Sequence, residues 1–282
     1  RFFSWSSIDS KSRVVILASI LLICSIPHST GQETITGWNE AESWTDHDLN
    51  AAIIHGELVW VFGDSGIVRF SDDSGATWQN HTNLGDVDLI SADSYENTMV
   101  ALSTDGIIYM KDGLESEWIT IDSSQTGMKS IALAGEESLI IVGNEGAIWH
   151  YTDQTWWNRT TSFTENLRDV DFNGADDGLA VGNAGTILAT DNGGTTWDYR
   201  EAPDPESSIV SVSYFNPYRM FAVSDSGQII YSTSPGGFEW QLREIESAGY
   251  NTTLATNLSS IDVVSSSRIL FTGPDGYLGL SL

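Results

Sequence analysis

Aspartates placed two apart in short apolar segments are the residues of this 282-residue chain best placed to do chemistry. Alternate residues of a β-strand share a face, so such pairs would point the same way. Carboxylates that converge repel one another unless a cation or a basic group of a partner lies among them. We favour solvated carboxylates at a channel with no cofactor or metal, and a weakly held divalent cation is the alternative. The candidate channel carboxylates are Asp86, Asp88, Asp169, Asp171 and Asp262.

No other side chains form a catalytic or metal-binding pattern. The histidines lack the spacing of metal ligands, and the chain has no G-x-S-x-G motif and no phosphate-binding loop. The one cysteine, Cys24, lies in an N-terminal apolar run. We therefore predict no catalytic residue. The histidines concerned are His47, His55, His81 and His150.

The elements that must position these residues recur about every forty residues. Each unit has an apolar strand, a tight turn that ends in glycine and a second apolar strand, with an earlier strand before them. A tryptophan opens a later strand in most units. Four-stranded units of this length are typical blades of a β-propeller. The turn glycines are Gly66, Gly106, Gly146, Gly185, Gly227 and Gly276, and the tryptophans are Trp78, Trp118, Trp157, Trp197 and Trp240.

We predict an all-β fold of six four-stranded blades, with seven blades as the alternative. The last unit has only three strands, and residues 36–48 are expected to supply its outer strand and so close the ring. One propeller domain then spans residues 32–282. Its blades are predicted near residues 49–82, 84–122, 128–160, 167–201 and 208–244, and at 258–282 plus 36–48.

Residues 1–31 have the pattern of a secretory signal peptide. Lys11 and Arg13 precede a 13-residue apolar run, and a small polar stretch follows Pro27. The run is short for a transmembrane helix. We predict export to an extracellular, periplasmic or lumenal space, with an uncleaved membrane anchor as the alternative. Four sequons are then candidate glycosylation sites, at Asn80, Asn158, Asn251 and Asn257.

The charge of the chain excludes two classes of partner. There are 12 basic and 39 acidic residues, a net charge of −27, which becomes −29 without residues 1–31. Nucleic-acid binding depends on Lys and Arg that displace counterions from phosphates, and anionic membrane surfaces attract the same basic residues. We therefore predict no nucleic-acid binding and no insertion of the mature domain into a bilayer. We also predict a monomer that binds a protein partner.

Two turns share the pattern S-x-D-x-G-x-T-W, the second with Thr in place of Ser and Asn in place of Asp. In such a turn Ser and Asp side chains bond to nearby backbone amides, glycine supplies a positive φ, and tryptophan buries the hairpin against its own blade. The turns resemble Asp-box, or BNR, repeats, which implies a structural role outside the ring, between third and fourth strands. The residues are Ser71, Asp73, Gly75, Thr77 and Trp78, and Thr190, Asn192, Gly194, Thr196 and Trp197.

Residues 167–200 carry a closer resemblance. The run LRDVDFNGADDGLAVGNAGTILATDNGGTTWDYR is similar to a repeat of the photosystem II assembly and stability factor family, and weaker similarity extends over residues 49–282. The resemblance implies a lumenal or periplasmic propeller that binds protein and helps to assemble a membrane complex. The photosynthetic branch has seven blades and an arginine-rich patch, whereas the mature chain here keeps seven Arg and two Lys.

Sialidases also carry Asp boxes, on six blades, and they are the enzymatic alternative. They need three arginines that converge on a substrate carboxylate, a Tyr–Glu nucleophile pair and an acid/base Asp. Here only Arg168 falls on an expected inner strand, so convergence is not expected. We predict a non-enzymatic exported scaffold for protein binding and assembly. A sialidase-like glycoside hydrolase and a cell-surface glycan-binding propeller are the alternatives.

Overall fold

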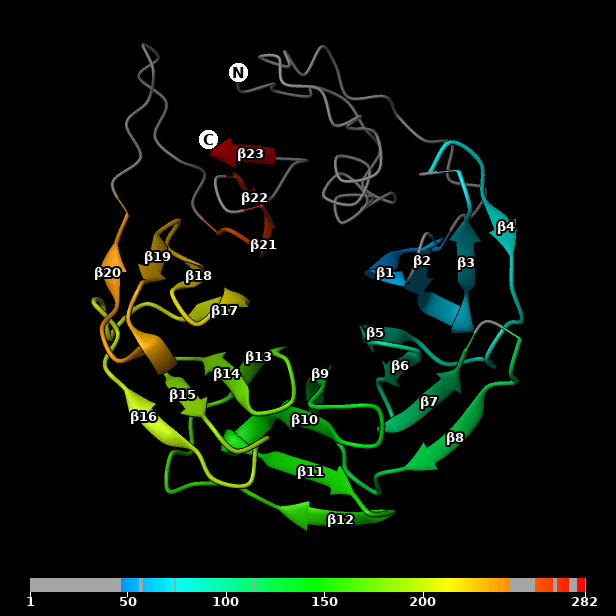
Figure 1. Ribbon diagram of the computed structural model, residues 1–282, viewed down its shortest axis with the longest axis horizontal. Helices are drawn as coiled ribbons and strands as arrows, with labels where there is room; N and C mark the ends of the chain where they lie inside the picture. Colours follow the sequence, from blue (N-terminus) through cyan, green and yellow to red (C-terminus); the bar gives the residue numbers. More distant parts are fainter. Residues whose placement is uncertain are drawn as a thin grey trace.

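The computed structural model describes residues 47–55, 58–73, 75–113, 115–243, 257–265, 268–273 and 278–281. Within them, antiparallel sheets follow one another around a common axis in sequence order (Figure 1). In each sheet the first strand lies nearest the axis and the last lies on the outside. The predicted all-β propeller of four-stranded blades is confirmed. No helix in this part of the chain is long and apolar enough to cross a membrane.

Five of the sheets are complete four-stranded blades. Blade 1 consists of β1 (Leu49–His55), β2 (Leu58–Gly63), β3 (Val68–Ser71) and β4 (Gln79–Asn80). Blade 2 consists of β5 (Leu89–Tyr95), β6 (Thr98–Ser103), β7 (Ile107–Asp112) and β8 (Ile119–Asp122). Blade 3 consists of β9 (Met128–Leu133), β10 (Leu139–Gly143), β11 (Ile148–Thr152) and β12 (Thr155–Asn158). Blade 4 consists of β13 (Leu167–Asn173), β14 (Asp177–Gly182), β15 (Ile187–Thr190) and β16 (Asp198–Arg200). Blade 5 consists of β17 (Ile209–Asn216), β18 (Arg219–Ser224), β19 (Ile229–Ser232) and β20 (Gln241–Leu242). Short 3-10 turns lie at η1 (Asp64–Gly66), η2 (Asn144–Gly146) and η3 (Pro235–Gly237).

The number of complete blades differs from the prediction. Among the described residues the structure shows five four-stranded blades, so the predictions of six and of seven such blades are wrong for this part of the chain. A further sheet has three strands, β21 (Ser260–Ser265), β22 (Arg268–Thr272) and β23 (Leu278–Ser281), because the last repeat provides no fourth strand among the described residues. The expected closing segment, apart from residues 47 and 48, and the predicted signal peptide lie outside the described residues.

A β-bulge near the start of the first strand is common to all five complete blades. In β13, Leu167 pairs with Gly182 and Asp169 pairs with Val181, which leaves Arg168 as the extra residue. A bulge disrupts the pairing locally and re-aims the side chains that follow it. It therefore decides which residues of the first strand face the axis.

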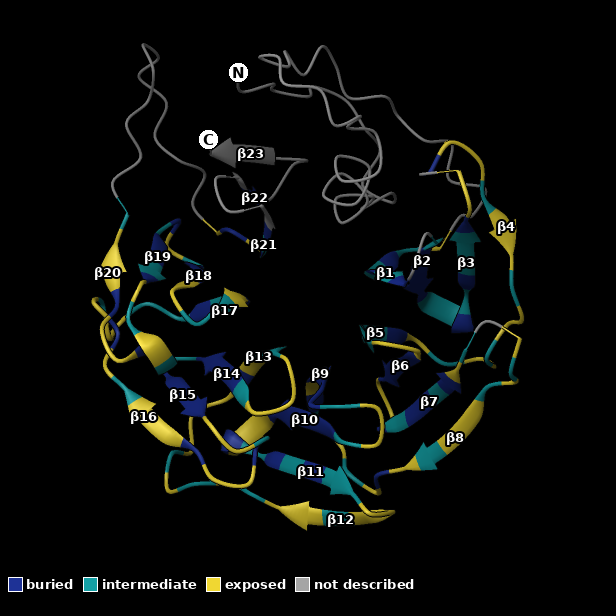
Figure 2. Cartoon of the chain, viewed as in Figure 1, coloured by how far each residue is buried: buried dark blue, intermediate teal, exposed yellow. Residues whose placement is uncertain are grey.

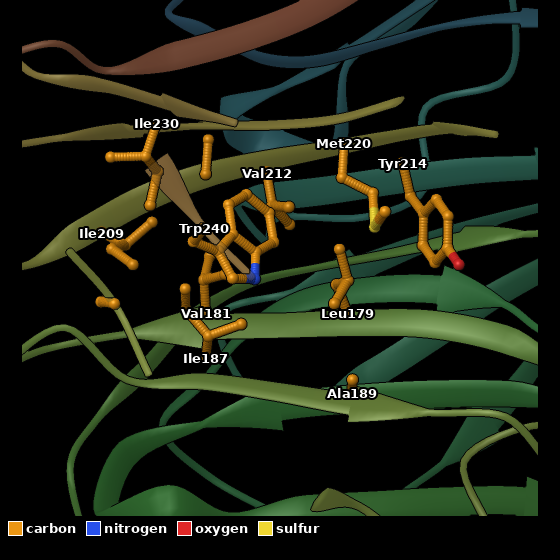
Figure 3. Packing of buried hydrophobic residues seen from close by; sticks show 12 residues of the cluster. Leu179, Val181, Ile187, Ala189, Ile209, Val212, Tyr214, Met220, Ile230 and Trp240 are labelled. Carbon is orange, nitrogen blue, oxygen red and sulfur yellow. The ribbon is translucent and has the colours of Figure 1, made fainter. Parts of the chain in front are cut away.

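The hydrophobic core lies between neighbouring blades. Figure 3 shows the cluster between blades 4 and 5, where Leu179 and Val181 of β14 meet Val212 of β17 and Met220 of β18. Figure 2 shows the same organisation as exposure, with buried inner strands and largely exposed fourth strands. Because this apolar area is buried only when adjacent sheets are in contact, it holds the blades together.

Most tryptophans near the fourth strands pack between blades, which corrects the predicted burial of Trp197 against its own blade alone. Trp78 packs on a cluster of its own blade, as predicted. Trp197 of blade 4 lies in one cluster with Ile140 of blade 3. In blade 3 the corresponding residue is Trp156, which packs on the cluster between blades 2 and 3 and donates to the Asp122 carbonyl oxygen at 3.2 Å. Trp157, the predicted residue, is 49% exposed.

Glycines in the turns between second and third strands allow close approach of the following loop. A Cβ on Gly146 would lie 2.0 Å from the Phe163 carbonyl oxygen, and one on Gly106 would lie 1.9 Å from the Gln125 carbonyl oxygen. The predicted positive φ is present at all turn glycines in the described residues. These are Gly66, Gly106, Gly146, Gly185 and Gly227.

Candidate functional site

A cavity of about 250 Å³ lies where the first strands of the sheets meet around the axis. All six sheets contribute to its wall, blade 1 through Ala52. The wall is rich in small polar and acidic side chains. The carboxylates are Asp93, Asp169, Asp171 and Asp262, and the hydroxyls of the first strands are those of Ser91, Ser130, Ser211, Ser213 and Ser260.

Two rows of side-chain acceptors join consecutive blades at this wall. In one row the Val212 N–H donates to Asp169 Oδ2 at 2.9 Å, and in the other the Tyr214 N–H donates to Asp171 Oδ2 at 2.6 Å. First strands are edge strands, and their buried N–H groups need partners. The channel side chains therefore act as connectors between blades. The other bonds of the rows run from Ile131 N–H to Ser91 (3.1 Å), Ile261 N–H to Ser211 (3.3 Å), Leu133 N–H to Asp93 (2.8 Å) and Val263 N–H to Ser213 (3.3 Å).

In these rows, the positions at which a single side chain accepts two backbone N–H groups are occupied by aspartate. Asp171 Oδ1 accepts the N–H of Phe172, in its own strand, at 2.8 Å, while Oδ2 accepts that of Tyr214. The preceding blade has Ala132 at the matching register, which cannot accept the Phe172 N–H. Asp93 and Asp169 likewise accept the N–H of the next residue, from Ser94 at 2.7 Å and Val170 at 3.0 Å.

Burial raises the pKa of the channel carboxyls. Loss of water raises the pKa of Asp171 to about 8 and that of Asp93 to about 6; neighbouring carboxylates add to the rise and the N–H bonds oppose it. Burial also raises the pKa of Asp169 and of Asp262. At neutral pH Asp171 is therefore mostly protonated, and the channel holds less negative charge than its carboxyl groups suggest.

The structure places two of the predicted channel aspartates elsewhere. The three that line the cavity are Asp169, Asp171 and Asp262. Asp86 and Asp88 are exposed before β5, and Asp88 Oδ1 accepts the Ser65 N–H at 3.1 Å. The sequence Asp-Val-Asp at residues 86–88 is identical to that at residues 169–171. The bulge of β5 nevertheless places Ser91 and Asp93 on the channel side. Asp93 is the channel carboxylate that the sequence analysis missed.

Among the described residues, the cavity wall lacks the arginine triad that a sialidase needs. No arginine is among the described residues that line it. Arg168 is exposed and donates to the Asn183 side-chain oxygen at 2.6 Å. His150 is buried beside Ser138, at 2.9 Å from Nε2 to Oγ. Within the described part of the chain, no three His, Cys, Asp or Glu side chains are grouped so that they could hold a metal ion.

The first predicted Asp-box turn, between β3 and β4, is held by its own side chains. Ser71 Oγ accepts the Gly75 N–H at 2.7 Å and donates to Asp73 Oδ1 at 2.8 Å. Asp73 also accepts the N–H and the hydroxyl of Thr77, at 2.8 and 2.6 Å, and these bonds lower the pKa of Asp73. The carboxylate is thus engaged within the turn. The second turn, between β15 and β16, has matching bonds among Thr190, Asn192, Gly194 and Thr196.

The turn between β19 and β20 keeps only part of this pattern. Ser234 Oγ accepts the Glu239 N–H at 2.9 Å, a bond that matches the one from Thr196 to Asn192. Trp240 Nε1 is buried with no hydrogen-bond partner in the described structure. The turn also carries Phe238, two residues before the tryptophan, where the other two turns have alanine and threonine. Phe238 is 67% exposed.

Three of the four candidate glycosylation sites lie within the described residues, and all three are exposed. Asn80 and Asn158 lie on the outer strands β4 and β12, where Asn80 accepts a hydrogen bond from Arg69. Asn257 has a φ of +72° and lies before β21. Asn251 falls outside the described residues.

Part of the sequence matches a known family, and solved propellers share the fold. Residues 150–245 match the family model of the photosynthesis system II assembly factor YCF48. Over this third of the chain the sequence resembles a photosystem II assembly factor-like propeller. The structure of YCF48 from Cyanidioschyzon merolae is 15% identical, with a TM-score of 0.56 over 86% of this chain and 98% of that one. YCF48 bound to D1 peptide is 18% identical, with a TM-score of 0.51 over 83% and 92%.

At these identities the solved structures show the fold, and the sequence match adds a resemblance to the YCF48 family over residues 150–245. A WD40 propeller domain of Doa1 has a TM-score of 0.66 at 12% identity, over 82% of this chain and 78% of that one. The family match lies within the end of blade 3, blade 4 and blade 5. No curated protein sequence matches the chain.

Proposed function

We propose that this chain is an exported, non-enzymatic propeller that binds a protein partner and helps a membrane complex to assemble. The match of residues 150–245 to the YCF48 family carries the proposal. YCF48, which shares the fold, has been solved with a bound D1 peptide, and a protein partner is the corresponding ligand class here.

The channel supports a scaffold better than an enzyme. Its carboxyls accept backbone N–H groups of two blades, so they are occupied in holding the ring together. A rigid ring presents loops at both ends of its blades, and such loops carry binding specificity. The proposal includes no cofactor.

Co-purification tests the proposal. The full chain, tagged at its C-terminus and expressed in its own organism, is purified from detergent-solubilised membranes next to a tag-only control. We expect a discrete membrane complex that the control lacks. Recovery of nothing beyond the control would count against an assembly role.

Two further measurements address the finer parts of the proposal. We expect no turnover of a fluorogenic sialoside, and turnover above the blank would favour the glycosidase alternative. We expect the chain in the exported fraction of intact cells as a monomer by light scattering. A cytoplasmic chain would overturn export, and a stable oligomer would overturn the monomeric state. Neither result would count against protein binding.

A further inference from the structure

One end of every blade contributes to the same face of the ring. In an antiparallel meander the turn between strands 1 and 2 and the turn between strands 3 and 4 lie at the same end of the sheet. The channel bonds join equivalent positions of successive first strands, as from Tyr214 to Asp171 and from Leu133 to Asp93, so the blades share one direction. We call the surface made by these turns the hairpin face.

Blade 5 presents exposed aromatic side chains on the hairpin face. Phe215 and Tyr218, at the turn between β17 and β18, are 38% and 63% exposed. Phe238, between β19 and β20, is 67% exposed and has the Arg200 guanidinium of blade 4 over its ring, 4.3 Å from the ring centroid. The two turns are two strands apart, or about 10 Å. Exposed aromatic groups of this kind are typical of binding surfaces. The turn between the first and second strands is acidic in other blades. It carries Glu96 in blade 2, Glu136 and Glu137 in blade 3, and Asp176 and Asp177 in blade 4.

Carboxylates of blade 4 lie near the strand that carries two of these aromatics, β17. Asp177 is close enough to Asp176 and Asp191 that their charges, after burial, raise its pKa. Burial and the charge of Asp177 also raise the pKa of Tyr214, the residue before Phe215 in β17. Tyr214 is 4% exposed, and its hydroxyl has no hydrogen-bond partner in the described structure. Mutually repelling carboxylates on the same face as exposed aromatics favour a ligand that supplies positive charge and apolar area together.

We propose that the hairpin face of blades 4 and 5 is the docking surface for a basic protein segment with an aromatic or branched aliphatic anchor. The proposal rests on the protein-binding function and specifies the chemistry of the partner. Charge complementarity selects this occupant, because Arg219 is the one exposed base in the described turns of this face, while Lys111 is buried. The exposed acids of the turns are Asp72, Asp73, Glu96, Asp112, Glu115, Glu117, Glu136, Glu137, Asp153, Asp176, Asp191 and Glu239.

Fluorescence anisotropy with designed peptides tests this surface. The probe is a labelled peptide of Lys-Leu-Gly units, compared with peptides of Lys-Ser-Gly and Glu-Leu-Gly units at physiological ionic strength. We expect the wild-type chain to bind the Lys-Leu-Gly peptide at least about tenfold more tightly than either comparison peptide. Equal binding of the Lys-Ser-Gly peptide would mean general attraction to an acidic protein, and it would overturn the proposal.

Paired variants locate the binding. We expect Phe215→Ser with Tyr218→Ser to weaken binding of the Lys-Leu-Gly peptide about tenfold or more. Asp176→Asn with Asp191→Asn should weaken binding and flatten its salt dependence. The matched control is Ile119→Ser with Tyr199→Ser, whose side chains are 59% and 42% exposed on fourth strands. Equal losses in the control and the aromatic variant would overturn the proposal.

Co-purification separates failure of this surface from failure of the proposed function. If the aromatic variant recovers the membrane complex as well as the wild type does, the docking surface is wrong and protein binding stands. If the wild type binds the Lys-Leu-Gly peptide through blade 5 but recovers no complex, the docking surface stands and the assembly role fails.

Discussion

Tyr214 and Asp171 connect two blades through a single hydrogen bond, in which the Tyr214 N–H donates to Asp171 Oδ2 at 2.6 Å. The other oxygen of the same carboxyl accepts the Phe172 N–H at 2.8 Å. One side chain thus satisfies the edge of its own strand and the edge of the next. The stability of the ring is therefore tied to a few polar side chains on its axis.

Replacing Asp171 should destabilise the ring. Asp171→Ala leaves two buried N–H groups without acceptors, and we expect a loss of about 2–4 kcal/mol in the free energy of unfolding. Urea unfolding monitored by tryptophan fluorescence measures this loss. The control is Asp86→Ala, at an exposed position of the similar Asp-Val-Asp run, which should change the free energy by less than about 0.5 kcal/mol. Equal effects of the two variants would contradict a connector role.

Stability should fall as pH rises toward 8. The pKa values of Asp93 and Asp171 are raised from 3.8 to about 6 and about 8 in the folded chain, so folding favours their protonated forms. That contribution is complete below pH 4 and is lost through about pH 6 for Asp93 and about pH 8 for Asp171. Urea unfolding at a series of pH values measures the slope. Asp171→Asn should remove the part between pH 6 and 8, and a variant slope equal to that of the wild type would refute the assignment.

Replacing Gly146, the turn glycine of blade 3, should cost more stability than replacing Gly174, which has free space around it. Gly146 and Gly174 both have positive φ, at +69° and +82°, but a Cβ on Gly146 would meet the Phe163 carbonyl oxygen while Gly174 has nothing within 4 Å. We expect Gly174→Ala to cost about 1–2 kcal/mol from backbone strain. Gly146→Ala should cost about 1–3 kcal/mol more from overpacking. Melting temperatures of the two variants check the order, and the reverse order would contradict the close approach.

The two adjacent tryptophans of blade 3 should differ in their contribution to stability. Trp156 packs toward blade 2 and donates to the Asp122 carbonyl oxygen, whereas Trp157 is 49% exposed. We expect Trp156→Ala to cost about 2 kcal/mol or more and Trp157→Ala less than about 1 kcal/mol. Denaturant midpoints measure both. A larger loss for Trp157→Ala would mean that the sequence-based choice of that residue was correct.

Much of the architecture could be predicted because it depends on interactions between residues that are close in the sequence. Glycine is needed where a turn demands positive φ, as at Gly146, and apolar strands must flank it, so the repeat shows the strands of each blade. The bonds of Ser71 and Asp73 span only a few residues, so their spacing was enough to recognise the turn.

The register of the channel could not be predicted from similar letters. The bulges move the side chains that face the axis, so the run at residues 86–88 was a poor guide to blade 2. Counting back from the turn glycine comes within one residue, since Asp171 lies 14 residues before Gly185 and Asp93 lies 13 before Gly106. That difference of one residue changes the face of the strand, so the bulge still decides which side chain lines the channel. The exposed aromatics of blade 5 depend on tertiary packing, which no local pattern of Phe and Tyr reveals.

The amount of the co-purifying membrane complex in cells that lack this chain tests the central claim most directly. Native gels of solubilised membranes would compare the deletion strain, the strain complemented with the wild-type chain and the parent. A scaffold for assembly predicts a several-fold loss of the intact complex in the deletion strain and full recovery on complementation. An unchanged amount of complex in the deletion strain would contradict the account.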